Sequence, residues 1–402
     1  MSTPSAARDA ESERRRRRAT WPILEHGFRP FFLGGALWMV FATLWWLHLF
    51  ASGGGASRFD PLAWHQHAML FGGVGAIVAG FLLTAIPNWT GRPPLAAGPL
   101  AALAGLWLAA RAANLVGAAL PIWLPAGLDV GFFAVLAGVA ANEVARGHNR
   151  RNAVVVGLVA LFAAAALGSQ LDAAGVWAGG PAARRLAMAV ALLLIALIGG
   201  RIVPSFTRNW LVARGAVRLP APADRFDRAA LAVLAAALAA WVAAPDARAS
   251  AVLALVAGVL HAVRLARWRG HATLAEPLVT VLHIGYAWLP LGMVLLGLER
   301  LLPALAVLSA EHALAAGAIG TMTLAVMTRA ALGHTGRALT AGPATLAIYA
   351  LVTTGALLRV AAYALPVDPL TALGTGGALW AGAFLLYAIR YAPILARPRR
   401  AS

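Results

Sequence analysis

Apolar residues dominate the chain in long stretches, and charged residues interrupt them only at intervals. Residues 30–50, 66–87 and 275–298 are largely apolar runs of about twenty residues, the length of helix that crosses roughly 30 Å of hydrocarbon. The hydropathy of the whole sequence predicts twelve membrane-spanning helices, near residues 30–50, 66–87, 98–120, 122–142, 153–173, 184–203, 229–244, 250–266, 275–298, 306–328, 343–365 and 369–390. The expected fold class is therefore an all-α polytopic membrane protein.

The composition of the 402-residue chain agrees with this pattern. Hydrophobic residues make up 61% of it, its mean hydropathy is +0.75 and only 12% of its residues are charged. Soluble proteins carry roughly 25% charged residues, so an ordinary soluble domain is excluded. The chain has no Cys, which also excludes disulfides and thiolate ligands to a metal.

The charge of +18 is explained by topology, without a nucleic-acid partner. All 33 basic residues are Arg, and cytoplasmic loops of membrane proteins collect basic residues. If the N-terminus lies inside, the outer loops hold only five of them: Arg58, Arg184, Arg185, Arg248 and Arg300. We therefore expect both termini in the cytoplasm.

Three parts of the chain follow from this topology. Residues 1–26 include five consecutive Arg at 14–18 and are expected to form a disordered, basic cytoplasmic arm. Residues 27–392 are expected to form one twelve-helix transmembrane domain. Residues 393–402 remain as a cytoplasmic tail.

A short motif recurs at the inner ends of the second, sixth and tenth predicted helices. Pro87 and Pro204 are 117 residues apart, as are Thr90 and Thr207, while Thr328 follows Thr207 by 121 residues. This spacing is typical of three four-helix repeats about a pseudo-threefold axis, although so short a similarity also arises by chance. If the repeat holds, these three helices are equivalent and central.

Ten His in so apolar a chain give the main indication of chemistry. An imidazole at membrane depth is costly unless it is paired, coordinates something or lines a cavity. Five are discounted because they lie at an interface or near loops: His26, His48, His148, His261 and His271. Five remain as candidates: His65, His67, His283, His312 and His334. A ring bonded to a helix carbonyl is the alternative for each one, but the set favours a metal or haem site, because imidazole is the usual ligand of haem iron and copper.

Several Arg could assist such a site. Without Cys a haem would be b-type and held non-covalently, and its propionates need cationic partners. The inner helix ends supply Arg201, Arg208 and Arg329, whose alternative role is to anchor those ends to lipid headgroups. Arg111 and Asp129 come to a similar depth in neighbouring helices, which predicts an ion pair. Exchanging these two residues should restore a protein that either single change to Ala cripples.

Six long motifs also occur in a characteristic order. They are GFRPFFL at 27–33, HQHAMLFG at 65–72, GFLLTAIPNWTG at 80–91, GRIVPSFTRNW at 200–210, LHIGYAW at 282–288, and HALAAGAIGTMTLAVMTR at 312–329 with GHTGR at 333–337. Over residues 27–390 the sequence resembles the NnrS family. The resemblance implies a bacterial inner-membrane protein that binds haem and copper and acts in nitric oxide metabolism or nitrosative-stress defence.

The family's His-bearing motifs fall on the five candidate His, but one position departs from the pattern. The family usually has Glu after the second His of the second motif, and this chain has Ala68. If that Glu carries a proton or binds a metal, Glu311 is the nearest substitute candidate. The predicted fold also looks like the catalytic subunit of haem-copper oxidases, except that the sixth and seventh predicted helices contain no His.

Two functions follow as alternatives. In the first, a membrane-buried haem binds nitric oxide or reduces it to nitrous oxide with electrons from an unidentified donor. His312, His65 and His67 would then ligate haem iron or copper, and His283 would be a second axial ligand or a copper ligand. In the second, the chain is a transporter or a nitric oxide sensor without redox turnover. Twelve spans suit a transporter, but the Pro and Gly motifs lie at predicted helix ends and not at the midplane.

Overall fold

The computed structural model describes residues 21–52, 55, 57–305 and 307–400, and within these all regular secondary structure is helical. Twelve long helices follow one another, and eleven of them are long and apolar enough to cross a membrane, which confirms a polytopic membrane protein. The helices are α2 (Phe28–Ser52), α3 (Pro61–His67) continued by η2 (Ala68–Val74) and α4 (Gly75–Thr90), α5 (Ala97–Leu115), α6 (Trp123–Arg146), α7 (Ala153–Ala173), α8 (Gly180–Leu194) continued by η5 (Ile195–Gly199) and α9 (Gly200–Val212), α10 (Arg225–Ala243), α11 (Arg248–Ala266), α12 (Pro277–Leu301), α13 (Ala310–His312) continued by η8 (Ala313–Gly320) and α14 (Thr321–His334), α15 (Pro343–Ala361) and α16 (Pro369–Leu395).

The ends of several helices differ from expectation, most of all in the sixth and tenth predicted helices. The sixth continues through Pro204 to Val212, nine residues beyond its predicted end, so the motif lies inside the helix. The tenth begins at Ala310, four residues after its predicted start, and runs to His334. Helix α5 forms as predicted, but Arg111 and Asn114 lower its mean hydropathy and it is not among the eleven candidate spans. Residues 1–20 of the predicted arm lie outside the described residues.

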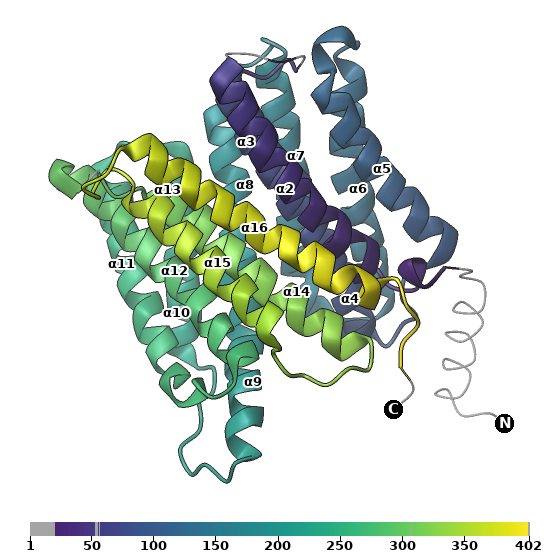
Figure 1. Ribbon diagram of the computed structural model, residues 1–402, viewed down its shortest axis with the longest axis vertical. Helices are drawn as coiled ribbons and strands as arrows, with labels where there is room; N and C mark the ends of the chain where they lie inside the picture. Colours follow the sequence, from purple (N-terminus) through teal and green to yellow (C-terminus); the bar gives the residue numbers. More distant parts are fainter. Residues whose placement is uncertain (1–20, 53–54, 56, 306, 401–402) are drawn as a thin grey trace. The chain divides into compact units, whose positions relative to one another are not determined.

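Figure 1 shows the helices in the order of the sequence, and the contacts divide the chain into two compact units. Unit 1 comprises Met1–Ala187, Ala330–Arg337 and Ala388–Ser402, and unit 2 comprises Met188–Arg329 and Ala338–Tyr387. Within unit 1, α6 packs against α5 and α7, and α2 packs against α4. Within unit 2, α11 packs against both α10 and α12, while α12 and α15 both pack against η8.

A buried Arg joins the first helix to the end of the last one inside unit 1. Arg29 in α2 is fully buried, and its Nη1 donates to the carbonyls of Leu395 at 2.8 Å and Arg397 at 2.6 Å. Its Nη2 forms an ion pair with Glu25 at 2.9 Å. Cations suit helix C-termini, where carbonyls lack helical donors, so Arg29 caps α16 and fixes the beginning of the predicted tail.

The three helices that share the recurring motif also share an irregular backbone. Each contains one π-helical segment, η2, η5 or η8. Such segments are rare, are often found at functional sites, and disturb the regular hydrogen bonding of the helix. The three irregular helices are therefore more alike than their short sequence motif indicates.

A carbonyl in each π-helical segment accepts a hydrogen bond from a side-chain N–H. Trp38 Nε1 donates to the Ala68 carbonyl at 2.8 Å, Arg264 Nη1 to the Ala196 carbonyl at 2.8 Å, and Trp380 Nε1 to the Ala316 carbonyl at 3.1 Å. A Gly follows each of these carbonyl residues by four positions: Gly72, Gly200 and Gly320. A Cβ at any of the three would lie 2.1 to 2.5 Å from the donor side chain. This shared contact supports the equivalence of the three helices, while the threefold axis stays a prediction.

Candidate functional site

His67, the last residue of α3, is buried in unit 1 and has a partner at each ring nitrogen. Its Nε2 lies 2.6 Å from Oδ2 of Asp129 in α6, and its Nδ1 lies 3.0 Å from Oγ of Ser169 in α7. Arg111 of α5 donates to the other carboxylate oxygen, which confirms the predicted ion pair. Gln170 Nε2 adds a hydrogen bond of 2.9 Å to Asp129 Oδ2. The cluster thus joins four helices of unit 1 around one carboxylate.

These bonds assign the tautomer of His67. An ionised carboxylate only accepts hydrogen bonds, so Nε2 carries the proton and donates to Asp129. Nδ1 is then the acceptor, and the Ser169 hydroxyl donates to it. Arg111 and Asp129 balance each other's charge with the ring neutral. The lone pair of His67 is therefore engaged by Ser169, and its part as a metal or haem ligand stays a prediction.

His65 lies two residues earlier in α3 and faces a different neighbour. Its ring stacks on Trp46, with centroids 4.8 Å apart and planes inclined by 25°. Residues i and i+2 of a helix point to different sides, so only His67 joins the cluster of Asp129. Ala68, at the position where the resemblance leads us to expect Glu, is buried, and Glu311, its predicted substitute, is exposed in α13.

His312 lies in unit 2 and is only the third residue of α13. It is therefore about 3 Å from the helix start at 1.5 Å per residue, nearer the surface than the predicted bounds imply. Its Nδ1 lies 2.9 Å from Ser309 Oγ, and its Nε2 lies 2.9 Å from Nη2 of Arg359 in α15. Because Arg only donates, Nε2 is the acceptor and Nδ1 carries the proton.

His283 in α12 is buried in unit 2 and has one nitrogen with a partner. Its Nε2 lies 2.8 Å from Thr207 Oγ1 in α9. The Thr207 hydroxyl donates to the Val203 carbonyl at 2.8 Å, so it accepts from the ring and Nε2 carries the proton. Nδ1 therefore has a free lone pair, and it is buried without a hydrogen-bond partner. A Cβ on Gly270 would lie 2.6 Å from it, so Gly270 packs closely against the ring and only glycine fits there.

The other predicted residues, His334, Arg329, Arg201 and Arg208, have surroundings of their own. His334 ends α14 in unit 1, where its ring centroid lies 5.6 Å from that of Phe28. In unit 2 the Arg329 guanidinium stacks over the Phe206 ring at 4.0 Å. Arg201 is half-buried and Arg208 is exposed, both in α9. The predicted propionate partners thus remain a prediction.

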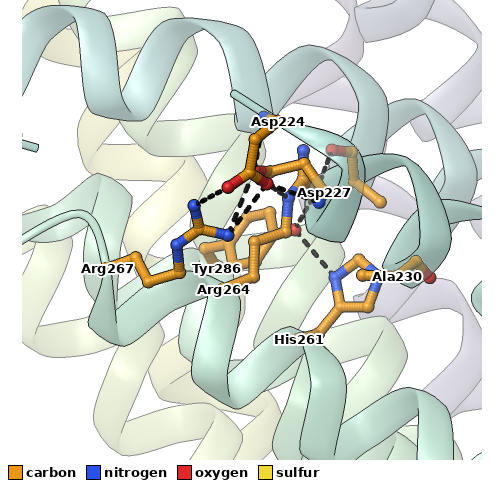
Figure 2. Close-up of polar contacts among 8 residues, drawn as sticks. Asp224, Asp227, Ala230, His261, Arg264, Arg267 and Tyr286 are labelled. Atoms are coloured by element: carbon orange, nitrogen blue, oxygen red, sulfur yellow. Dashed lines mark hydrogen bonds and ion pairs between the residues drawn. The ribbon is translucent and has the colours of Figure 1, made fainter. Parts of the chain in front are cut away.

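A second buried polar cluster in unit 2 was not predicted. Figure 2 shows it between α10, α11 and α12. Arg264 Nε donates to Asp227 Oδ1 at 2.8 Å, and Arg264 Nη1 donates to the Tyr286 hydroxyl at 2.8 Å. The hydroxyl in turn lies 2.8 Å from Nδ1 of His261, whose Nε2 donates to the Ala230 carbonyl at 3.2 Å. The cluster is therefore fully hydrogen-bonded from Asp227 to Ala230.

His261 was discounted as a residue near a loop, and this prediction was wrong, because its ring is buried. The ring is fully buried inside α11, because Tyr286 and Ala230 satisfy both of its nitrogens there. His261 and Arg264 are three residues apart, which places them on one face of a helix, and that polar pair in an apolar segment was the available signal. At the edge of the cluster Arg267 pairs with Asp224 at 2.5 Å.

The predicted metal ligands do not gather into one metal site within the described residues. No three of their His, Asp and Glu side chains come together as a metal ion would require. His65, His67 and His334 belong to unit 1, and His283 and His312 to unit 2. A three-His copper site finds no support in these contacts. A single axial ligand to haem iron needs only one free imidazole lone pair, and His283 Nδ1 fits that requirement.

Comparison with known protein families identifies a family for this chain. The family described as NnrS protein matches residues 22–399, which is nearly the whole chain. No curated protein matches the sequence. The match covers both units and every helix described above.

Proposed function

The chain belongs to the NnrS family of membrane proteins of nitric oxide metabolism, and on that premise we propose that it binds nitric oxide at a non-covalently held haem. The proposed location is the bacterial inner membrane, with both termini in the cytoplasm, as the distribution of Arg predicts. Nitric oxide is small and apolar, so it reaches a buried site through the bilayer without a polar channel. Haem, when bound, supplies an iron atom that takes nitric oxide as a ligand.

One observation supports His283 as the residue that would hold the haem iron. Its Nδ1 is buried, bears a lone pair by the tautomer argument, and has no hydrogen-bond partner. Buried polar atoms are normally satisfied, so an unsatisfied imidazole nitrogen suggests a ligand. Thr207 accepts the proton of the opposite nitrogen and fixes the ring, as the neighbours of coordinating His usually do. Gly270 keeps the approach to Nδ1 free of a side chain.

We propose binding of nitric oxide in preference to its reduction, because the chain of hydrogen bonds that could carry protons ends at a peptide carbonyl. Reduction to nitrous oxide needs protons as well as electrons from a donor. The chain of polar groups in Figure 2 starts at the partly exposed Asp224 and ends at the Ala230 carbonyl. A peptide carbonyl does not pass a proton on, so this cluster makes a poor proton path. Copper, the second predicted cofactor, is kept as a family-based proposal only.

An optical spectrum of the detergent-purified chain tests the proposal. It is recorded oxidised and reduced, with and without nitric oxide, beside metal analysis. We expect a Soret band that shifts with nitric oxide, disappears in His283→Gly and returns when imidazole is added. His271→Ala, next to Gly270 on an exposed side chain, is the control and should keep the band.

Three other results have definite meanings. Loss of the band in His312→Ala but not in His283→Gly would overturn the assigned ligand and keep the haem. A colourless, metal-free protein from cells with ample haem would reject haem binding and favour the transporter. Nitrous oxide produced from nitric oxide with a reductant would extend the proposal to catalysis.

A further inference from the structure

His312 and Arg359 form a tightly held pair in unit 2, at one end of three helices. His312 lies at the start of α13, Arg359 two residues before the end of α15, and the backbone N–H of Ser309 donates to the Val360 carbonyl at 3.0 Å. Arg359 Nη1 also donates to the Leu373 carbonyl of α16 at 3.3 Å. Both side chains are partly exposed, which leaves the pair within reach of small solutes.

The pair carries an unbalanced positive charge. His312 is neutral, because its Nε2 accepts a hydrogen bond from the guanidinium. Within the described part of the chain no ion pair joins Arg359 to a carboxylate, although Arg111 and Arg264 each have an Asp partner. A cation in a membrane-spanning segment usually has a partner or lines a polar site. An anion bound here would balance this charge.

The cluster around His67 shows what such an anion would do. His67 and His312 each stand directly before a π-helical segment, and each has a Ser hydroxyl at Nδ1, at 3.0 Å and 2.9 Å. The partner of Nε2 differs between the two His. In unit 1 the Asp129 carboxylate stands between His67 and Arg111 and accepts from both. In unit 2 the guanidinium of Arg359 contacts His312 directly.

We infer that His312 and Arg359 bind a small planar oxyanion of the carboxylate or nitrite class, in the role that Asp129 has between His67 and Arg111. One oxygen accepts from Arg359 and the other from His312 Nε2. The ring supplies that proton by changing tautomer, and the Ser309 hydroxyl turns from acceptor to donor at Nδ1, as Ser169 is at His67. No net proton uptake is needed.

The surroundings of Arg359 leave room for this rearrangement. Gly377 of α16 faces the guanidinium, and a Cβ there would lie 3.2 Å from Nη1 with no other atom within 4 Å. The guanidinium can therefore move away from Nε2 without meeting a side chain at that position. An Asp introduced at this site would place a carboxylate beside Arg359 within the chain itself.

Thermal unfolding of the purified full chain tests the inference. It is followed in sodium nitrite and in sodium formate, against sodium chloride at equal ionic strength. Both oxyanions should raise the melting temperature, because a ligand that binds only the folded state stabilises it. Arg359→Gln should weaken the apparent nitrite affinity about ten- to a hundredfold, the range for losing hydrogen bonds to a charged group. Arg300→Gln, at an exposed ion pair with Asp246, should keep the response.

A matched pair of variants keeps the inference testable if Arg359→Gln does not fold. Gly377→Asp should raise the melting temperature without added anion and lose the nitrite response. Gly377→Asn, of the same size and without charge, should keep that response. An equal nitrite response in both variants would overturn the inference, as would an undiminished response in Arg359→Gln.

Repeating the nitrite titration after haem is added distinguishes two sources of the oxyanion, a free anion and a carboxylate of haem. If the nitrite response persists, the occupant is a free anion. If haem alone removes the nitrite response of the wild type, and raises the melting temperature of the wild type more than that of Arg359→Gln, the occupant is a haem carboxylate. The nitrite response before haem addition does not depend on haem binding, so failure of the proposed function would leave this result intact.

Discussion

Nε2 of His67 lies 2.6 Å from Oδ2 of Asp129, and this contact changes what the predicted Arg111 to Asp129 ion pair means. Asp129 accepts hydrogen bonds from Gln170 and Asn114 as well as from Arg111 and His67. Exchange of Arg111 and Asp129 would set a guanidinium among these donors. We therefore no longer expect the exchange to rescue the protein, contrary to the expectation from sequence.

Asp129→Ala should be more damaging than Arg111→Ala. Removing the carboxylate leaves Arg111 charged and buried without its partner, which costs about 3–5 kcal/mol. Removing Arg111 leaves Asp129 with three donors, and His67 can take up a proton to balance it. Thermal unfolding in detergent should therefore give a lower melting temperature for Asp129→Ala. Equal losses would show that His67 does not compensate.

The three Gly beside the π-helical segments should not tolerate Ala. A Cβ at Gly72, Gly200 or Gly320 would lie within 2.1 to 2.5 Å of Trp38, Arg264 or Trp380 and would displace the donor from its carbonyl. Overpacking of this kind costs about 1–3 kcal/mol.

Gly138→Ala in α6 is the control for this series, because a Cβ there meets nothing within 4 Å. Replacing a helical Gly should then stabilise by about 0.5–1 kcal/mol. Melting temperatures of the four variants check the prediction. A loss of stability in Gly138→Ala equal to that in the other three would show that helix backbone, and not the donor contact, is responsible.

The sequence could predict what depends on hydropathy and residue spacing. The apolar runs located all twelve helices, and the depths of Arg111 and Asp129 predicted their ion pair correctly. The predicted end of the sixth helix was too early, because Pro204 lies inside the helix and Pro usually marks a helix end. The π-helical segments had no visible signal, since a shift in backbone hydrogen bonding leaves no periodic trace in so apolar a sequence.

The candidate rings were harder to distinguish by sequence. His261 and His283 lie in similar apolar surroundings, yet one is satisfied by Tyr286 and Ala230 and the other has a nitrogen without a partner. That difference depends on residues far away in the chain, such as Thr207, 76 positions from His283. Spacing along one helix carries no information about such partners.

The ion pair of Asp224 and Arg267, outside the membrane-spanning segments, sets a pH dependence. The hydrogen bond from Arg267 lowers the pKa of the Asp224 carboxyl from 3.8 to about 2. A lowered pKa in the folded state gives stability that is present above 3.8 and lost as the pH falls through about 2. The ion pair should thus make the same contribution to the free energy of unfolding at every pH in the neutral range.

Asp224→Asn isolates this contribution, because Asn remains a good N-cap for α10. The difference in melting temperature between Asp224→Asn and the wild type should be the same at all pH values well above 3.8, shrink below it and vanish near 2. A difference that changes near neutral pH would indicate another titrating group.

Thr207 should control how well His283 binds haem. Its hydroxyl accepts the Nε2 proton at 2.8 Å and holds the lone pair on Nδ1. Loss of such a second partner typically lowers metal affinity 10- to 100-fold. Thr207→Val should therefore weaken haem affinity by roughly that factor, whereas Thr207→Ser, which keeps the hydroxyl, should stay close to the wild type. Haem titration followed at the Soret band gives the affinities.

The matched control is Thr328→Val, because Thr328 also donates to its own helix but contacts the Tyr349 hydroxyl at 2.6 Å and no His. It should lose some stability and keep the haem affinity. If both Val variants weaken haem binding alike, general loosening of the helices is the cause. If neither does, Thr207 does not position the ring, and the assignment of His283 loses its main structural support.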